Sequence, residues 1–231
     1  MSRVTVVTPT YNERENITQL YARLRAVAPD VDILVIDDGS PDGTAELVDE
    51  LAGWDDRISV HRRDGKQGLA SAYVLGFELA LERGADRIIQ MDADLSHAPE
   101  DVPRLLAVDA DVVIGSRYVQ GGGTVNWPIQ RRLLSRCGSL YARWCLGLPF
   151  RDLTGGFKVW RRHMLTSVLS RPVESDGYAF QVELTWRAWR AGGRMHEVPI
   201  IFTERTAGVS KIDRGIAVEA AWLVPALRLR R

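Results

Sequence analysis

Two carboxylates lie two residues apart in the segment Asp92-Ala93-Asp94, directly after the apolar run Ile88–Met91. Where a chain turns at the end of a strand, two such carboxylates can share one hard cation. Mg²⁺ and Mn²⁺ take one or two protein carboxylates and complete their coordination shell with water and substrate phosphates. The segment therefore predicts a divalent metal site that holds a phosphate-bearing substrate. The alternative is an Asp-x-Asp that only caps a loop.

Polar side chains also follow other apolar runs of the first half. These groups are Thr10-Tyr11-Asn12-Glu13, Asp37-Asp38, Asp92-Ala93-Asp94 and Arg117. Parallel strands end at the same edge of a sheet, and ligands of such sheets bind beyond the carboxyl ends of the strands. We therefore expect these groups to line one site.

The elements that must position this site alternate between strand and helix over residues 1–115. Continuous apolar strands separated by helices are typical of a parallel sheet that is covered on both faces, an α/β fold. The expected strands are Val4–Thr8, Ile33–Ile36, Ile58–His61, Ile88–Met91 and Val112–Ile114. The expected helices begin after an Asn12 N-cap and at Asp42 or Thr44, cover Gly68–Arg83, and include a short one from Pro99.

The second half is less regular. A flexible loop is expected around Gly121–Pro128, and a helix over Ile129–Leu146 with apolar residues on one face. Further predicted elements are an added strand over Asp152–Trp160, a helix over Ala179–Ala191, a strand over His196–Phe202 and a helix over 213–230 interrupted at Pro225. We predict one catalytic domain, residues 1–212, followed by a C-terminal elaboration, residues 213–231.

Charge is distributed unevenly along the chain of 231 residues. Residues 1–115 carry 11 Lys and Arg against 22 Asp and Glu, whereas residues 116–163 carry nine basic residues and one acidic residue, Asp152. Such a division is typical of a site that joins a metal to phosphates or of a basic face toward anionic lipid, and the alternative is an uneven distribution of surface charge without a function. No apolar stretch approaches the ~20 residues that a membrane span needs.

Several other classes of protein lack support in the sequence. The chain contains no Walker A motif, no G-x-G-x-x-G after the first strand, no zinc-like spacing of its histidines and no G-x-S-x-G. Cys137 and Cys145 lie about 12 Å apart on one expected helix, too far for a disulfide. We interpret them as core thiols of a protein from a reducing compartment.

Five motifs then follow one another in order. They are Pro9-Thr-Tyr-Asn-Glu-Arg-Glu-Asn16, Ile36-Asp-Asp-Gly-Ser-Pro-Asp-Gly-Thr44, Met91-Asp-Ala-Asp-Leu-Ser-His97, Gly115-Ser-Arg-Tyr118 and Asp152-Leu-Thr-Gly-Gly-Phe157. The pattern continues through Ser175–Gln181 and Pro199–Lys211. Over residues 3–212 the chain resembles the GT-A-fold family 2 glycosyltransferases, specifically the polyprenyl (dolichyl) phosphate mannose synthases.

The resemblance implies a GT-A (Rossmann-like) fold and inverting transfer of mannose from GDP-mannose to a polyprenyl phosphate, with Mg²⁺ or Mn²⁺ as cofactor. It assigns the metal to Asp92 and Asp94. It assigns the nucleotide sugar to Pro9, Tyr11, Glu13, Ile36, Asp38, Asp92, Ala93, Asp94, Arg117, Arg205 and Lys211. An aromatic ring can pack a base, and carboxylates can accept from guanine N–H groups or ribose hydroxyls.

The acceptor phosphate is already anionic at pH 7, so it needs positioning by cations and no general base. Arg117 is the first choice for this role. Arg131 is the second, because Ser135 lies one turn further along the same helix face. We expect Asp94, Arg117 and Arg131 to be catalytic. Asp152 and Gln181 are expected sugar contacts, and a solvated helix face is the alternative for Arg131.

The lipid acceptor implies contact with a membrane. Residues 213–231 mix apolar residues with arginines, as an amphipathic helix at a membrane interface does, and a terminal core helix is the alternative. We expect peripheral association with the cytoplasmic face of a membrane, with a separate integral-membrane protein as a candidate partner and no nucleic acid.

Three other functions stay open. A UDP-sugar transferase acting on the same lipid would keep the mechanism and change the donor. A non-catalytic subunit would keep only the fold, but the intact Asp92, Asp94 and Arg117 argue against it. A nucleotidyltransferase would have a glycine-rich basic loop after its first strand, and Pro9–Glu13 has no such composition.

Overall fold

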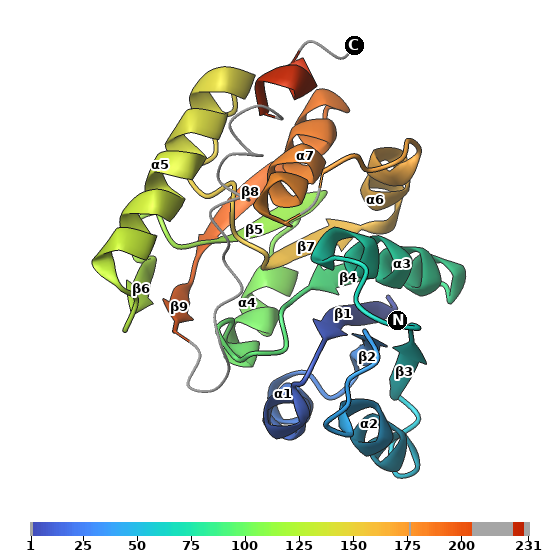
Figure 1. The fold of residues 1–231 in the computed structure, drawn as a ribbon. Coiled ribbons are helices and arrows are strands. Elements are labelled where there is room, and N and C mark those ends of the chain that lie inside the picture. Colours follow the sequence, from blue (N-terminus) through green and yellow to red (C-terminus); the bar gives the residue numbers. More distant parts are fainter. Residues whose placement is uncertain (1, 176, 205–223, 229–231) are drawn as a thin grey trace.

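A computed structural model describes residues 2–175, 177–204 and 224–228. Seven strands form the central sheet, in the order β3-β2-β1-β4-β7-β5-β8 (Figure 1). All of its neighbours pair in parallel except β7, which runs antiparallel to β4 and β5. The strands are β1 Val4–Thr10, β2 Asp32–Asp37, β3 Ile58–Arg62, β4 Arg87–Gln90, β5 Val112–Ser116, β7 Lys158–Arg161 and β8 Met195–Pro199.

Helices cover both faces of this sheet and bury two apolar cores. They are α1 Arg14–Val27, α2 Thr44–Ala52, α3 Leu69–Glu82, the 3₁₀ turn η1 Pro99–Asp101, α4 Val102–Leu106, α5 Ile129–Leu146, α6 Arg162–Leu169 and α7 Gly177–Arg190. One core contains residues of α1, α2 and α4, and the other contains residues of α3, α6, α7 and the end of α5. The predicted α/β architecture is confirmed.

The added strand is shorter than predicted and begins only at Lys158. Residues 152–157 form a loop instead, because Asp152 turns inward. Its carboxylate accepts hydrogen bonds from the main-chain N–H groups of Arg117 and Gly155, at 2.9 and 3.1 Å. The segment that positions this carboxylate is therefore a loop, and β7 begins after it.

The strand predicted over His196–Phe202 is two strands. β8 pairs with β5 as far as Pro199, and β9 (Ile201–Thr203) pairs with β6 (Gly123–Val125). Between them Ile200 donates its N–H to Ser116 and accepts from Gly123, both at 3.0 Å. The loop predicted around Gly121–Pro128 thus contains a short strand, which carries the chain toward α5.

Three local predictions are wrong. Asn12 does not cap α1, since it adopts φ 58° and the cap position is Glu13. Cys137 is exposed on α5, so only Cys145 is a core thiol. Residues Arg162–Leu169, for which we predicted no element, form α6, whose Met164, Leu165 and Val168 are buried.

The predicted C-terminal helix lies mostly outside the described residues. Residues 224–228 are helical and contain Pro225, at which we predicted an interruption. Val224 and Leu227 are buried in the core beside α3 and α7, and Arg228 donates to the carbonyl of Cys145 at 2.9 Å. This stretch therefore favours the core-helix alternative. Within the described part of the chain, no helix has the length and apolarity to cross a membrane.

Candidate active site

The two carboxylates of the Asp-x-Asp segment follow β4, where α3 and the chain beyond the strand hold them. Asp92 Oδ1 accepts a hydrogen bond of 2.6 Å from the hydroxyl of Tyr73 on α3, and Asp94 Oδ1 accepts from the N–H of Ser96 at 3.0 Å. Leu95, which directly follows Asp94, has φ 60°, an uncommon conformation for a side chain of its size. Burial and the nearby charge of Asp92 raise the pKa of Tyr73 well above its ordinary value, so Tyr73 acts as a hydrogen-bond donor.

This arrangement fits a hard divalent cation. No group of three or more His, Cys, Asp or Glu suited to a metal occurs among the described residues, so the pair would need oxygens of a substrate to complete a shell. Asp92 of this pair lies beside Gly156, which has no side chain. A Cβ at Gly156 would lie 3.5 Å from Asp92 Oδ2 and 3.6 Å from Gln181 Nε2. The predicted metal ligands are thus compatible with a metal that also binds phosphate.

The expected nucleotide contacts gather at the ends of β1 and β2. Asp38 Oδ1 accepts from Arg63 Nε at 2.6 Å, in an ion pair that is almost completely buried. Tyr11 lies under the ammonium of Lys66, with Nζ 4.5 Å from the ring centroid. The side chain of Ile36 is fully buried in the core, so only its main chain remains for a nucleotide.

The structure also shows how these ends are held together. Asp37 Oδ1 accepts hydrogen bonds from the hydroxyls of Thr10 and Ser40, at 2.8 and 2.6 Å. Glu13, a predicted nucleotide contact, accepts from the side-chain amide of Asn16 at 2.7 Å. Asp37 therefore ties β1 to β2, while Glu13 is anchored within the first turn of α1.

Arg117 follows β5 and forms a buried bidentate ion pair with Asp152. Its Nε and Nη2 donate to the two carboxylate oxygens of Asp152, both at 2.7 Å, and the side chains are 4% and 0% exposed. Burial alone would raise the pKa of Asp152, but the charge and hydrogen bonds of Arg117 lower it. Asp152, a predicted sugar contact, thus holds Arg117 in position.

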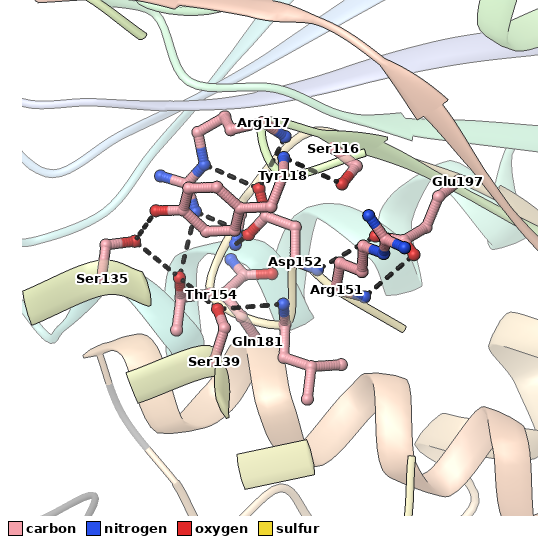
Figure 2. A network of polar contacts seen from close by, with 12 residues as sticks. Ser116, Arg117, Tyr118, Ser135, Ser139, Arg151, Asp152, Thr154, Gln181 and Glu197 are labelled. Carbon is pink, nitrogen blue, oxygen red and sulfur yellow. Dashed lines mark hydrogen bonds and ion pairs between the residues drawn. The ribbon is translucent and has the colours of Figure 1, made fainter. Parts of the chain in front are cut away.

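A chain of hydroxyl groups connects this ion pair to α5 (Figure 2). Arg117 Nη2 donates to Thr154 Oγ1 at 3.0 Å, and Thr154 Oγ1 lies 3.1 Å from Ser135 Oγ. The hydroxyl of Tyr118 donates to Ser135 Oγ at 2.7 Å. The predicted acceptor residues Arg117 and Ser135 are therefore brought together, with Thr154 between them.

Arg131 reaches the same region from the first turn of α5. Its Nη1 lies 2.5 Å from Glu204 Oε1, and its guanidinium packs on the indole of Trp127, 5.2 Å from the ring centroid. Arg117 packs on the same indole at 5.3 Å. Three buried polar atoms here have no hydrogen-bond partner: Trp127 Nε1, Arg131 Nε and Glu204 Oε2. Trp127 thus packs against both arginines, and these three polar atoms make no hydrogen bond.

Gln181 on α7 lies between this region and the Asp-x-Asp segment. Its Oε1 accepts from Lys158 Nζ at 2.7 Å and from Gln90 Nε2 at 2.9 Å, and Gln90 Oε1 in turn accepts from Trp160 Nε1. With Oε1 engaged twice, the amino group of Gln181 faces Gly156. Burial lowers the pKa of Lys158 to about 7.

Sequence reasoning did not identify Tyr73, Trp127, Thr154 or Lys158 as parts of the site. The sequence could have identified Lys158, because it is the one charged residue within the apolar run Phe157–Trp160. In the structure its side chain is fully buried. Thr154 lies within the motif Asp152–Phe157, but the motif assigned it no role. Tyr73 and Trp127 gave no signal, because their roles depend on contacts between distant segments. Two predicted residues, Arg205 and Lys211, lie outside the described residues.

The site therefore has a carboxylate side and an arginine side. Carboxylates with a metal can hold a nucleotide diphosphate, and paired arginines can hold a second phosphate. The two sides meet at Gly156 and Gln181, where a group could pass from one phosphate to the other.

Comparisons with known proteins identify the family of this chain. Residues 5–169 match glycosyl transferase family 2. The chain is 50% identical over 226 residues to the polyprenol monophosphomannose synthase of Mycolicibacterium smegmatis, covering 96% of this chain and 85% of that protein. It is 48% identical over 220 residues to the undecaprenyl-phosphate mannosyltransferase of Micrococcus luteus, covering 94% and 90%.

Solved structures share the fold. The glucosyl-3-phosphoglycerate synthase of Mycobacterium tuberculosis, in complex with Mn²⁺, UDP-glucose and phosphoglyceric acid, matches with a TM-score of 0.70. The match covers 98% of this chain and 80% of that chain, at 18% identity. At this identity the likeness concerns the arrangement of strands and helices alone.

Proposed function

The chain belongs to glycosyl transferase family 2 and is a glycosyltransferase, and we propose that it transfers mannose from GDP-mannose to a polyprenyl phosphate. The observation that carries the proposal is the pair of arginines packed on Trp127 beside the Asp-x-Asp segment. Two relatives that are about half identical, and that are named for polyprenol or undecaprenyl phosphate mannosyl transfer, support the same acceptor and sugar.

The acceptor phosphate supplies its own nucleophile. One of its oxygens attacks the anomeric carbon on the face opposite the departing GDP, so the reaction inverts the configuration at that carbon. Because both substrates are anionic, cations must offset their repulsion, and we assign this role to Arg117 and Arg131. Arg131 must exchange its bond to Glu204 for one to phosphate.

Asp92 and Asp94 would hold Mg²⁺ or Mn²⁺ against the diphosphate of the donor. When bound, such a metal offsets the charge that develops on departing GDP. The hydroxyl of Tyr73 keeps Asp92 oriented for this contact. The amino group of Gln181 is the donor that we assign to a sugar hydroxyl, since its carbonyl oxygen is engaged by Lys158 and Gln90.

The lipid acceptor requires contact with a membrane, and we assign this contact to α5. Figure 1 shows α5 along the side of the molecule opposite α1 and α2. Apolar side chains along this helix are exposed: Ile129 63%, Leu133 55%, Leu140 63% and Trp144 81%. Arg132 and Arg136 are exposed among them. Apolar side chains with neighbouring arginines suit peripheral binding to anionic lipid at the cytoplasmic face.

The experiment follows labelled sugar into a lipid extract. Purified protein receives polyprenyl phosphate and Mg²⁺ or Mn²⁺, with GDP-mannose, UDP-glucose or UDP-GlcNAc in parallel. We expect label from GDP-mannose alone, abolished by EDTA. Label from a UDP-sugar alone would overturn the donor. No label, even after native membranes are added to supply a membrane partner, would overturn the function.

A further inference from the structure

A second cluster of arginines lies beside the acceptor region and takes no part in the reaction outlined above. It surrounds a cavity of about 310 Å³ toward the C-terminal half of α5. The lining residues are Tyr118, Arg136, Leu140, Arg143 and Arg151, which we call the arginine pocket. A cavity of this size is at the lower end of the range for small-ligand pockets.

Among the residues that the structure describes, no carboxylate pairs with a guanidinium of the arginine pocket. Arg117 and Arg131 each have a carboxylate partner. In the described ranges of the chain, by contrast, no carboxylate forms an ion pair within 4.0 Å with the guanidinium of Arg136, Arg143 or Arg151. Glu197 lies nearby, but the donors that it accepts from are the main-chain N–H groups of Arg151 and Asp152.

One of these arginines also has an unused donor. Arg143 Nε is buried and has no hydrogen-bond partner. Leaving a buried charged donor unsatisfied costs free energy, and gathering three like charges adds repulsion. An anion in the pocket would remove both costs. Phosphate suits the geometry, because a guanidinium can bind two of its oxygens at once.

The rim of the arginine pocket indicates what the anion is attached to. Leu140 both lines the pocket and projects into solvent, and Trp144, one turn further along α5, is 81% exposed. A free polar anion gains no binding free energy from these apolar side chains. A phosphate that carries acyl chains would cover them, since burial of apolar surface is favourable.

We propose that the arginine pocket binds the phosphate of an anionic phospholipid, separately from the acceptor phosphate. The proposal deepens the membrane contact assigned to α5 and rests on it. Tyr118 forms one wall of the pocket and donates its hydroxyl to Ser135, so it lies between the two phosphate sites. Its ring lies beneath Arg136, 5.3 Å from the guanidinium carbon to the centroid. A phospholipid held here would set the acceptor region at the level of the headgroups.

The test measures binding of the full chain to vesicles that contain no polyprenyl phosphate, with no nucleotide sugar present. Vesicles of phosphatidylcholine with phosphatidylglycerol are compared with phosphatidylcholine alone, by sedimentation. We expect Arg143→Gln and Arg136→Gln each to weaken binding to the anionic vesicles about tenfold or more, because a charge-assisted hydrogen bond is lost. Thermal unfolding of each variant checks that it folds.

Arg132→Gln is the matched control, because Arg132 is exposed on the same helix and does not line the pocket. Diffuse attraction to an anionic surface gives about 1 kcal/mol per basic residue, which is about fivefold. We expect the control to lose no more than this. Equal losses for Arg132→Gln, Arg136→Gln and Arg143→Gln would overturn the proposal.

Inorganic phosphate separates the lipid from a free anion. We expect millimolar phosphate, with ionic strength held constant by chloride, to weaken vesicle binding by the wild type and to have little effect on Arg143→Gln. Vesicle binding of the wild type that phosphate leaves unchanged would overturn the pocket as the lipid site. Because no transfer is measured, a failure here is distinct from a failure of the proposed glycosyl transfer.

Discussion

The carboxylate side and the arginine side of the site are built in opposite ways. On the carboxylate side, Asp92 and Asp94 follow β4 and Asp37 ends β2, and hydroxyl or N–H groups hold all three. On the arginine side, carboxylates from distant parts of the chain hold Arg117 and Arg131. The carboxylate side can bind cations directly. The arginine side can bind an anion only if its arginines release or share their carboxylate partners.

This difference indicates how the site can bind two anionic substrates one after the other. On the carboxylate side, a metal held by Asp92 and Asp94 would supply positive charge for a diphosphate. The arginine side is neutralised in advance, so only a phosphate that competes with Glu204 can engage Arg131.

The largest effect is expected on the carboxylate side. Asp92→Asn should lower kcat/KM about 1,000-fold or more, because the metal contributes several kcal/mol of charge stabilisation. Steady-state transfer with Mn²⁺ checks this. Asp56→Asn removes an exposed charge far from the Asp-x-Asp segment and should leave the rate unchanged. A folded Asp92→Asn variant with the wild-type rate would contradict the metal assignment.

Among changes on the arginine side, removal of Asp152 should lower the free energy of unfolding most. Asp152→Ala leaves Arg117 buried without its partner and should lower the free energy of unfolding by about 3–5 kcal/mol, measured with urea. The double variant Arg117→Met, Asp152→Leu should recover most of this loss, because it replaces the ion pair by apolar contacts. It should not recover use of the lipid acceptor. If it does, Arg117 has only a structural role.

A smaller effect is expected from the hydroxyl that orients Asp92. Tyr73→Phe should weaken Mn²⁺ binding in the presence of GDP about tenfold, because groups that orient metal ligands typically contribute this much. Electron paramagnetic resonance of Mn²⁺ measures the affinity. The matched control is Tyr21→Phe, which removes a 3.0 Å hydrogen bond to Asp55 on the far side of α1. Equal affinities of the two variants for Mn²⁺ would show that Tyr73 does not orient a metal ligand.

The smallest effect concerns the carboxylate that competes with the acceptor. Glu204→Gln should lower the KM for polyprenyl phosphate about fivefold, because a partly exposed ion pair contributes up to about 1 kcal/mol. Glu100→Gln breaks a comparable ion pair with Arg23 elsewhere and is the control. A raised KM in Glu204→Gln would indicate that Glu204 positions Arg131 rather than competing for it.

The sequence predicts the carboxylate side well because local patterns determine it. Each strand there is an apolar run that ends in polar residues, and parallel strands bring those ends to one edge. The positions of Asp92 and Asp38 therefore follow from short segments. Ile36 is the exception, since both faces of β2 are covered by apolar cores and its side chain is buried in one of them.

The arginine side is harder to predict because its contacts join distant segments. Arg117 and Asp152 are 35 residues apart, and Arg131 and Glu204 are 73 residues apart. Nothing in the periodicity indicates that β7 enters the sheet antiparallel or that Lys158 then faces Gln181. The exposed apolar face of α5 and the exposed Cys137 also contradict the usual rule that apolar helix residues are buried.

The central claim is that the two sides bind different substrates. The most direct test measures two constants for Arg131→Gln and the wild type. These are the dissociation constant of GDP-mannose with Mn²⁺ in the absence of lipid, and the KM for polyprenyl phosphate. We predict that the dissociation constant of GDP-mannose changes by less than about twofold and that the KM for polyprenyl phosphate rises about tenfold or more, because we assign Arg131 to the acceptor phosphate and not to the donor. A large loss of GDP-mannose affinity with an unchanged KM for the lipid would contradict the division of the site.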